Sequence, residues 1–354
     1  MSSISKKQRE AFATTPLFQA YRSLVPPLSE ALHKGQGGRI GVFGGSSDYT
    51  GAPFFSGMAA LRLGADLGHI ICDQDAATAI KSYSPDLIVH PYLQIRSLTE
   101  LMQQIDREEN SSRLKKLEEQ LKAKWNEVYG NIDDLLKRLH VLVVGPGLSR
   151  DSLMLHFASH TIQEARKLQM PIIIDADGLY LVQSQPGLVQ GYSKAVLTPN
   201  LVEFERLCKA MSIDPNSVEP EEPPVVKLSQ AFEGAIVIQK GKWDVISDGK
   251  KVHVVDREGG LKRSGGQGDI LTGVLATSLG WGLAYQKNVW SHAMDVPQED
   301  ITMTACFGAC HIVRACSWVA YGKHRRALQS SDVLAEVGPF FDRLYSEEDP
   351  TLVW

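Results

Sequence analysis

The sequence has little that would suit a secreted, nucleic-acid-binding or membrane-spanning protein. Its 354 residues include only five cysteines, and this odd number favours reduced thiols over a disulfide framework. The formal net charge of -4 provides no basic excess to neutralise nucleic-acid phosphates, so a general nucleic-acid binder is excluded. Residues 1–10 are polar and lack the apolar segment of a secretory signal. We therefore expect a cytoplasmic protein.

One apolar run, residues 301–320, is about as long as a membrane span. It contains His311 and Arg314, which are costly to place in hydrocarbon, so we expect a buried core helix and no membrane partner. Cys306, Cys310 and His311 could also suggest a metal site. In a continuous helical run of small residues, they are more typical of buried packing.

Two common nucleotide-binding motifs are also absent. Gly41-x-x-Gly44-Gly45 lacks the spacing of the dinucleotide fingerprint, and this loop is no Gly-Lys-Ser/Thr phosphate loop. What the chain does have is a steady alternation of apolar β-branched runs with helical patterns, at 43% hydrophobic and 22% charged residues. This alternation predicts an α/β fold, with a doubly wound, mostly parallel sheet flanked by helices in three layers. No internal repeat or sharp break divides it, so we expect one domain over residues 1–354.

The expected strands, with the turns that end them, lie in nine segments. They cover residues 39–45, 69–73, 86–90, 141–148, 171–178, 195–200, 235–241, 244–249 and 251–255. Residues 1–38 are predicted to be a helical lead-in, residues 284–299 an irregular insertion, and two helices close the chain. Residues 98–139 are dense in charges of both signs, with leucines three and four residues apart. They predict an inserted amphipathic helix pair, either a covering layer or a partner surface.

The glycine-rich stretch 259–269 runs directly into a helical pattern at residues 270–276. A helix start presents unpaired N–H groups and a partial positive charge, and glycines let an anion approach the backbone closely. Asp269 at this junction has two interpretations. It caps the helix, or it lies in a phosphate cradle and takes a proton from a hydroxyl group. We favour the general base.

Two further groups of polar residues follow predicted strands. Asp175 and Asp177 are expected on one strand face, where they either steer Mg²⁺ through water or cap the next helix. Asn200 is a good helix N-cap, and Glu203 three residues later completes a capping box.

Six motifs appear in one order along the chain. They are Gly44-Gly45-Ser46, Gly145-Pro146-Gly147, Ile174-Asp175-Ala176-Asp177-Gly178-Leu179, Thr198-Pro199-Asn200-x-x-Glu203-Phe204, Lys240-Gly241 and Gly265-Gly266-Gln267-Gly268-Asp269. Over roughly residues 20–340 the chain therefore resembles the ATP-dependent (S)-NAD(P)H-hydrate dehydratases of the ribokinase-like superfamily, in their eukaryotic form. Segments 98–139 and 284–300 are insertions in this comparison.

The resemblance implies an enzyme, a lyase that uses ATP to dehydrate the S epimer of hydrated NADH and NADPH through a phosphorylated intermediate. It implies Asp269 as the catalytic base, Mg²⁺ with ATP as co-substrate, and Glu203 as a residue on the metal side. The implied lining of the hydrated dinucleotide is Asp269 with Gly147, Asn200, Leu201, Val202, Glu203, Phe204, Glu205 and Arg206. The implied ATP contacts are Lys240, Gly241, Lys242, Trp243, Asp244, Gly259, Gly260, Leu261, Lys262, Arg263, Ser264, Gly265, Gly266, Gln267 and Gly268.

Two alternatives stay open from the sequence. One is a ribokinase-like kinase of a vitamin-precursor alcohol, and the other is a non-catalytic nucleotide-binding protein that interacts through residues 98–139. For the favoured enzyme, the expected partners are its small-molecule substrates, hydrated NADH or NADPH and ATP. A homo-oligomer remains one of the alternatives for assembly. The sequence leaves open whether NADH hydrate or NADPH hydrate is preferred and whether ATP or ADP is the phosphate donor.

Overall fold

One nine-stranded sheet forms the framework of the protein. The computed structural model describes residues 16–30, 33–217, 223–292 and 294–345. The strands are β1 (Arg39–Phe43), β2 (Leu67–Asp73), β3 (Ile88–Leu93), β4 (Val141–Val144), β5 (Ile172–Ile174), β6 (Ala195–Leu197), β7 (Ile236–Gln239), β8 (Asp244–Ser247) and β9 (Val252–Val255). Their order is β3-β2-β1-β4-β5-β6-β7-β8-β9, parallel up to β7 and antiparallel for β8 and β9. The predicted mostly parallel α/β sheet is confirmed.

Successive residues of the central strands enter two separate cores. In β4, Val141 and Val143 join the core on one face, while Leu142 and Val144 join the core on the other. This follows from the two-residue period of a strand. A strand that is apolar on both faces has to be covered on both, as the sequence of residues 141–144 predicts.

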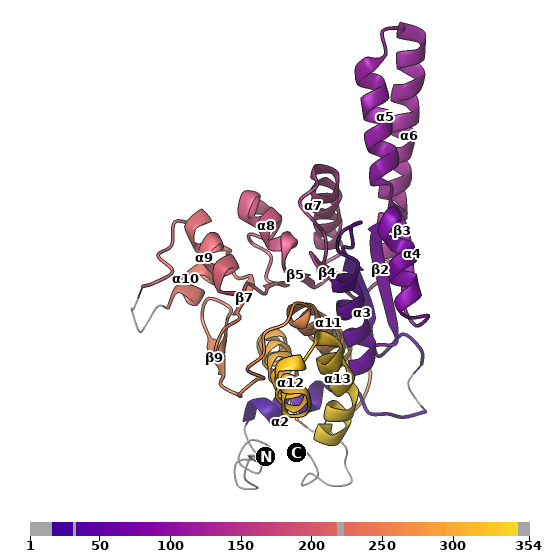
Figure 1. The fold of residues 1–354 in the computed structure, drawn as a ribbon. Helices are drawn as coiled ribbons and strands as arrows, with labels where there is room; N and C mark the ends of the chain where they lie inside the picture. The colour runs from indigo at the N-terminus through magenta and orange to yellow at the C-terminus, as the bar shows by residue number, and fades with distance from the viewer. Residues whose placement is uncertain (1–15, 31–32, 218–222, 293, 346–354) are drawn as a thin grey trace.

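Helices cover both faces of the sheet, which gives the three predicted layers (Figure 1). One face carries α2 (Pro16–Leu24), α3 (Gly51–Leu63), α4 (Gln74–Tyr83), α11 (Gln267–Gln286), α12 (Ile301–His324) and α13 (Ser330–Tyr345). The other carries α7 (Ser152–Lys167), α8 (Asp177–Ser184), α9 (Leu201–Ala210) and α10 (Pro224–Ala231). Short 3₁₀ turns occur at Pro186–Leu188 (η1), Gln298–Asp300 (η2) and Arg325–Ala327 (η3).

One predicted boundary needs correction. The lead-in predicted over residues 1–38 contains the helix α2, and its first 15 residues lie outside the described part. The irregular segment predicted at residues 284–299 starts later, because α11 continues to Gln286 before the chain leaves the helix. Residue 293 of that segment is also outside the described part.

The charged segment forms the helix hairpin α5 (Ile95–Arg107) and α6 (Ser111–Leu136), as predicted. It is not a covering layer along its whole length, because it projects beyond the sheet from the edge at β3 (Figure 1). Full burial is confined to its base, at Leu98, Leu101, Val128, Ile132, Leu135 and Leu136. Leu114 and Leu117, further along α6, stay partly exposed. The leucine spacing therefore mainly joins the two helices to each other.

The apolar run of the sequence is the helix α12, and it packs inside the molecule. By length and composition, Gln298–Ala327 is the one candidate for a membrane span among the described residues, yet 89% of its most apolar window is buried. Cys306, Cys310 and His311 are all buried on this helix. Within the described ranges, no group of three or more His, Cys, Asp or Glu side chains is arranged to hold a metal ion. Burial in a core explains the run.

We expect Gly308→Ala to destabilise the fold by about 1 to 3 kcal/mol, the usual range for overpacking a core. A Cβ atom on Gly308 would lie 2.3–2.4 Å from ring atoms of Tyr21, whose hydroxyl is 2.7 Å from Ser278 Oγ. Urea unfolding of the two proteins measures the change. Gly322→Ala on the same helix is the control, because its Cβ meets no atom within 4 Å. It should keep or raise the free energy of unfolding, since alanine favours helix. Equal effects of the two substitutions would contradict the packing argument.

Candidate functional site

A cavity of about 590 Å³ opens at the carboxyl edge of the sheet, beside the start of α11. This edge is where open α/β sheets bind their ligands. The lining residues are Asp175, Ala176, Asn200, Glu203, Lys240, Gly241, Lys242, Asp244, Gly259, Arg263, Ser264, Gly265, Gly266, Gln267, Gly268, Asp269, Leu271, Cys310, Val313, Arg314 and Ser317. The structure thus brings most of the residues assigned to ATP next to Asn200, Glu203 and Asp269.

The glycine-rich loop forms the floor of this cavity at the first turn of α11. Gly266 precedes the helix with a φ of +99°, and no side chain caps the helix start. A Cβ at Gly265 would meet no atom within 4 Å, so its backbone faces open space. The side chain of Gln267 donates to Lys262 O and Ser264 Oγ and holds the loop in shape. Free N–H groups at a helix start, next to an open backbone, suit a phosphate.

Asp269 lies in the first turn of α11 and lines the cavity. The N-cap position is Gly266, which has no side chain, and the Asp269 carboxylate accepts a hydrogen bond from its own backbone N–H at the helix start, so a local structural role is combined with a place in the cavity. Burial and the charges of Asp175 and Glu203 raise the pKa of Asp269 to about 7, whereas Lys240 and the backbone N–H lower it. A carboxylate with a pKa near neutrality is suited to accept a proton from a hydroxyl group. The geometry and the pKa thus agree with the role of general base.

Asp175 and Lys240 form a buried ion pair at the back of the cavity. Lys240 Nζ lies 2.7 Å from Asp175 Oδ1, and Thr198 Oγ1 donates to the same oxygen over 2.8 Å. Burial opposes the charge of Lys240, but the carboxylates of Asp175 and Glu203 outweigh it and keep its pKa above the ordinary value. Lys240 is therefore not the exposed lysine that ends many strands. It is a cation fixed at the cavity wall.

The prediction that Asp175 and Asp177 share one strand face is wrong. β5 ends at Ile174, and Ala176, with a φ of +48°, turns the chain between the two acids. Asp177 then begins α8 and pairs with Arg150, whose Nε lies 3.2 Å from Asp177 Oδ1. Neither acid caps α8 through its side chain. The strand ends with its last apolar residue, before the two acids that the prediction included in it, so the two-residue period does not apply to them.

The capping box at α9 is confirmed. Glu203 N donates to Asn200 Oδ1 over 3.0 Å, and Asn200 N donates to Glu203 Oε2 over 2.8 Å. Both side chains also line the cavity. Burial raises the pKa of Glu203, whereas the charge of Lys240 lowers it. Structural and ligand-facing roles are therefore combined in the same two residues.

Arg314 of α12 is a cavity residue that sequence reasoning missed. It pairs with the buried Asp244 at 3.1 Å and donates to the carbonyl oxygens of Gly241, Lys242 and Arg257. It thus joins the loop after β7 to the segment after β9, both of which reach the cavity. In the sequence, the one feature that could have indicated this residue was an arginine inside an apolar helical run. A buried charge needs a partner of opposite charge, so an acidic residue nearby was to be expected.

Other sequence-assigned residues do not line this cavity. Gly147, with a φ of +64°, packs closely on Tyr49, whose carbonyl oxygen would lie 2.4 Å from a Cβ. Phe204 is buried in the core beneath α9, and Gly260 packs against Ser317. The remaining ones outside the lining are Leu201, Val202, Glu205, Arg206, Trp243, Leu261 and Lys262. The family resemblance assigned them, and one of them, Arg206, lines a smaller recess beside this cavity.

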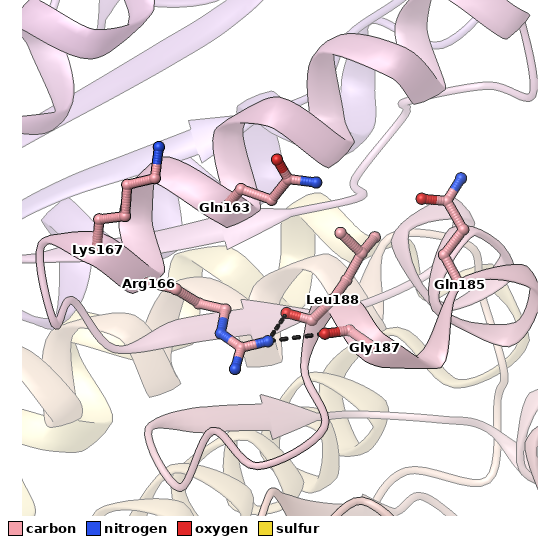
Figure 2. A pocket seen from close by; sticks show the side chains of 6 residues that line it. All are labelled: Gln163, Arg166, Lys167, Gln185, Gly187 and Leu188. Carbon is pink, nitrogen blue, oxygen red and sulfur yellow. Dashed lines mark hydrogen bonds between the residues drawn. The ribbon is translucent and has the colours of Figure 1, made fainter.

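A second cavity of about 440 Å³ lies between α7 and η1 on the helical surface (Figure 2). Arg166 Nη1 donates to the carbonyl oxygens of Gly187 and Leu188, each over 2.8 Å. Its guanidinium also lies 5.2 Å from the ring centre of Tyr192. The polar groups of Arg166 are therefore engaged in holding η1 against α7, and we assign this cavity no ligand.

Comparison with known proteins finds relatives along nearly the whole chain. A family model described as NAD(P)H-hydrate dehydratase matches residues 40–334. A Neurospora crassa protein is 46% identical and covers 99% of this chain and 100% of its own length. A Schizosaccharomyces pombe protein is 41% identical, with 96% of each chain covered. Both relatives are named ATP-dependent (S)-NAD(P)H-hydrate dehydratase.

Solved structures share the fold at low sequence identity. A ribokinase-like superfamily protein from Enterococcus faecalis has a TM-score of 0.64 and 18% identity, with coverage of 92% of this chain and 93% of that chain. An ADP/ATP-dependent NAD(P)H-hydrate dehydratase from Bacillus subtilis, co-crystallised with ATP/Mg²⁺, has a TM-score of 0.57 and 17% identity. The match covers 95% of this chain and 97% of the bacterial chain. The ribokinase-like architecture expected from the motifs is confirmed.

Proposed function

The chain belongs to the NAD(P)H-hydrate dehydratase family, and we propose that it uses ATP to remove water from the S epimer of hydrated NADH and NADPH. The reaction restores the reduced nucleotide and releases ADP and phosphate. The observation that carries the proposal is Asp269, a carboxylate with a pKa of about 7 at the junction of a glycine-rich anion site and an open cavity. The names of the two relatives favour a dehydratase over a kinase of a vitamin-precursor alcohol.

The mechanism follows from the poor leaving ability of hydroxide. Asp269 takes the proton of the ring hydroxyl as its oxygen attacks the γ-phosphate, and ADP leaves. Backbone N–H groups near Gly265 and Gly266, together with Lys240, stabilise the charge on the transferred group. Phosphate then leaves together with the former hydroxyl oxygen, and the lone pair of the ring nitrogen assists the cleavage of the carbon–oxygen bond. Loss of a proton from the neighbouring ring carbon restores the double bond.

Mg²⁺ fits this site as a companion of ATP. It prefers oxygen ligands and usually binds one or two carboxylates together with substrate phosphates. Asp175, Glu203 and Asp269 supply carboxylates to the cavity wall, of which Asp175 is engaged by Lys240. Of these, Glu203 keeps one oxygen outside the capping box. When bound, the ion would offset the negative charge of the phosphates.

The direct test combines the purified protein with Mg²⁺, ATP and hydrated NADH. We expect the absorbance of reduced nicotinamide to return, with one ADP formed for each NADH restored. If a phosphorylated product accumulated instead and the absorbance did not return, the protein would be a kinase and the proposal would fail.

The rate should depend on pH through Asp269. Burial raises the pKa of this acid, and a base acts only when it is deprotonated, so activity requires a pH above the raised value. We expect kcat/KM to fall about tenfold per unit as the pH drops below about 7. Initial rates of ADP release across this range give the profile. A rate that stays constant down to about pH 5 would point to a carboxylate with an ordinary pKa and contradict the assignment.

A further inference from the structure

A small recess adjoins the active-site cavity on the side of β4, β5 and β6. Its volume is about 100 Å³, and it shares the lining residues Ala176 and Glu203 with the main cavity, so the two spaces are neighbours. Each of the three neighbouring strands contributes one large side chain to it through the segment that follows the strand. These are Arg150 after β4, Tyr180 on α8 and Arg206 on α9.

Arg150 is held in a fixed orientation with donors to spare. Its guanidinium lies 4.4 Å from the ring centre of Tyr180, and its Nε donates to Asp177 Oδ1 over 3.2 Å. Its two Nη atoms make no hydrogen bond to any residue in the described part of the chain. A guanidinium fixed on one edge and open on the other is suited to bind a phosphate through two parallel hydrogen bonds.

Arg206 adds a second positive charge to the same recess. It is exposed on α9, and within the described ranges it forms neither an ion pair nor a hydrogen bond. The nearest acid of the shared wall, Glu203, is already bound by the backbone N–H of Asn200 and faces the charge of Lys240. The recess is therefore lined by two arginines and two acids, and both acids are already engaged, Asp177 by Arg150 and Glu203 by the backbone N–H of Asn200.

The recess is lined by none of the residues assigned to ATP. The glycine-rich loop and the loop after β7 line the main cavity, whereas the recess is lined by Arg150, by residues of the segment 176–183, and by Glu203 and Arg206. An anion at Arg150 and Arg206 would thus belong to the second substrate, and a hydrated dinucleotide carries a diphosphate in its centre.

We propose that Arg150 and Arg206 bind the diphosphate of the hydrated dinucleotide while its hydroxylated ring lies at Asp269. This inference rests on the proposed function and names the part of the substrate that the recess recognises. Because both NADH hydrate and NADPH hydrate contain the diphosphate, these residues serve both substrates equally. They increase substrate affinity and do not take part in the proton transfer.

The test compares Arg150→Ala and Arg206→Ala with the unaltered protein on three substrates. For hydrated NADH and hydrated NADPH, we expect KM to rise about 10- to 100-fold with Arg150→Ala, the range of a lost charged hydrogen bond, and less with the exposed Arg206. The KM for ATP should not change. On the hydrated form of reduced nicotinamide riboside, which has the ring and hydroxyl but no phosphate, the variants and the unaltered protein should have equal kcat/KM.

Arg166→Ala is the matched control, because Arg166 also lies over a tyrosine but lines neither the active-site cavity nor the recess. It should lower the melting temperature without changing any KM. Arg150→Lys, which keeps the charge, should recover part of the affinity. A KM increase confined to hydrated NADPH would overturn the proposal in favour of its extra phosphate, and an equal loss on the riboside would show a merely structural role. If the unaltered protein turned over none of these substrates, the proposed function itself would be wrong.

Discussion

Asp269→Asn should lose about 10³-fold or more in kcat while ATP still binds. The substitution keeps the shape of the side chain but removes its ability to accept the proton, a role that contributes roughly 10²- to 10⁴-fold in enzymes. Its buried carboxylate is also unfavourable for folding when ionised, because burial raises its pKa to about 7. The neutral amide should therefore leave the melting temperature at pH 8 equal or higher. Turnover is measured as ADP release, and ATP binding by calorimetry.

Asp134→Asn serves as the control for this experiment. Asp134 is an exposed aspartate on α6 that pairs with Lys137 at 2.8 Å, and it does not line the cavity. This variant should have the kcat of the unaltered protein. An Asp269→Asn protein that still turned over hydrated NADH at more than about a tenth of the normal rate would remove Asp269 from the role of base.

The sequence was sufficient for features that repeat or that depend on the backbone. Alternating apolar runs gave a parallel sheet because β-branched residues fit a strand buried on both faces, as at Val141–Val144. The glycine-rich loop was correctly expected at the start of a helix, and it lines the cavity, because glycines allow the tight turn that leaves backbone N–H groups open there. The capping box of Asn200 and Glu203 was also visible, since it is a contact between residues three positions apart.

The sequence was insufficient where a residue acts through a distant partner. Arg314 reaches Asp244 across 70 positions of chain, and Lys240 reaches Asp175 across 65. No periodicity relates such pairs, because only the order of strands in the sheet brings them together. The end of β5 was misjudged for a related reason. The strand ends with the apolar run at Ile174, and Ala176 then adopts a φ of +48°, which the sequence does not reveal. This turn sends Asp175 and Asp177 to different partners.

Lys240→Met should combine a large loss of activity with a shifted pH profile. The lost charge removes a contact to the transferred phosphate, and a missing donor of this kind lowers kcat by about 10²- to 10³-fold. Because Lys240 also lowers the pKa of Asp269, its removal raises that pKa further. The acid side of the pH profile should therefore move to higher pH. Lys240→Arg keeps the charge and should leave the profile in place.

The ion pair with Asp175 allows the two effects of Lys240 to be separated. In Lys240→Met, Asp175 becomes a buried carboxylate without its cation, and breaking such a pair destabilises a protein by about 3 to 5 kcal/mol. Adding Asp175→Asn removes that charge, so the double variant should recover much of the melting temperature. The charge of Asp175 raises the pKa of Asp269, so the pH profile should also return toward lower pH. The kcat should stay low, because the contact to the transferred phosphate is still missing. If Lys240→Met left both the pH profile and kcat unchanged, Lys240 would have only a structural role.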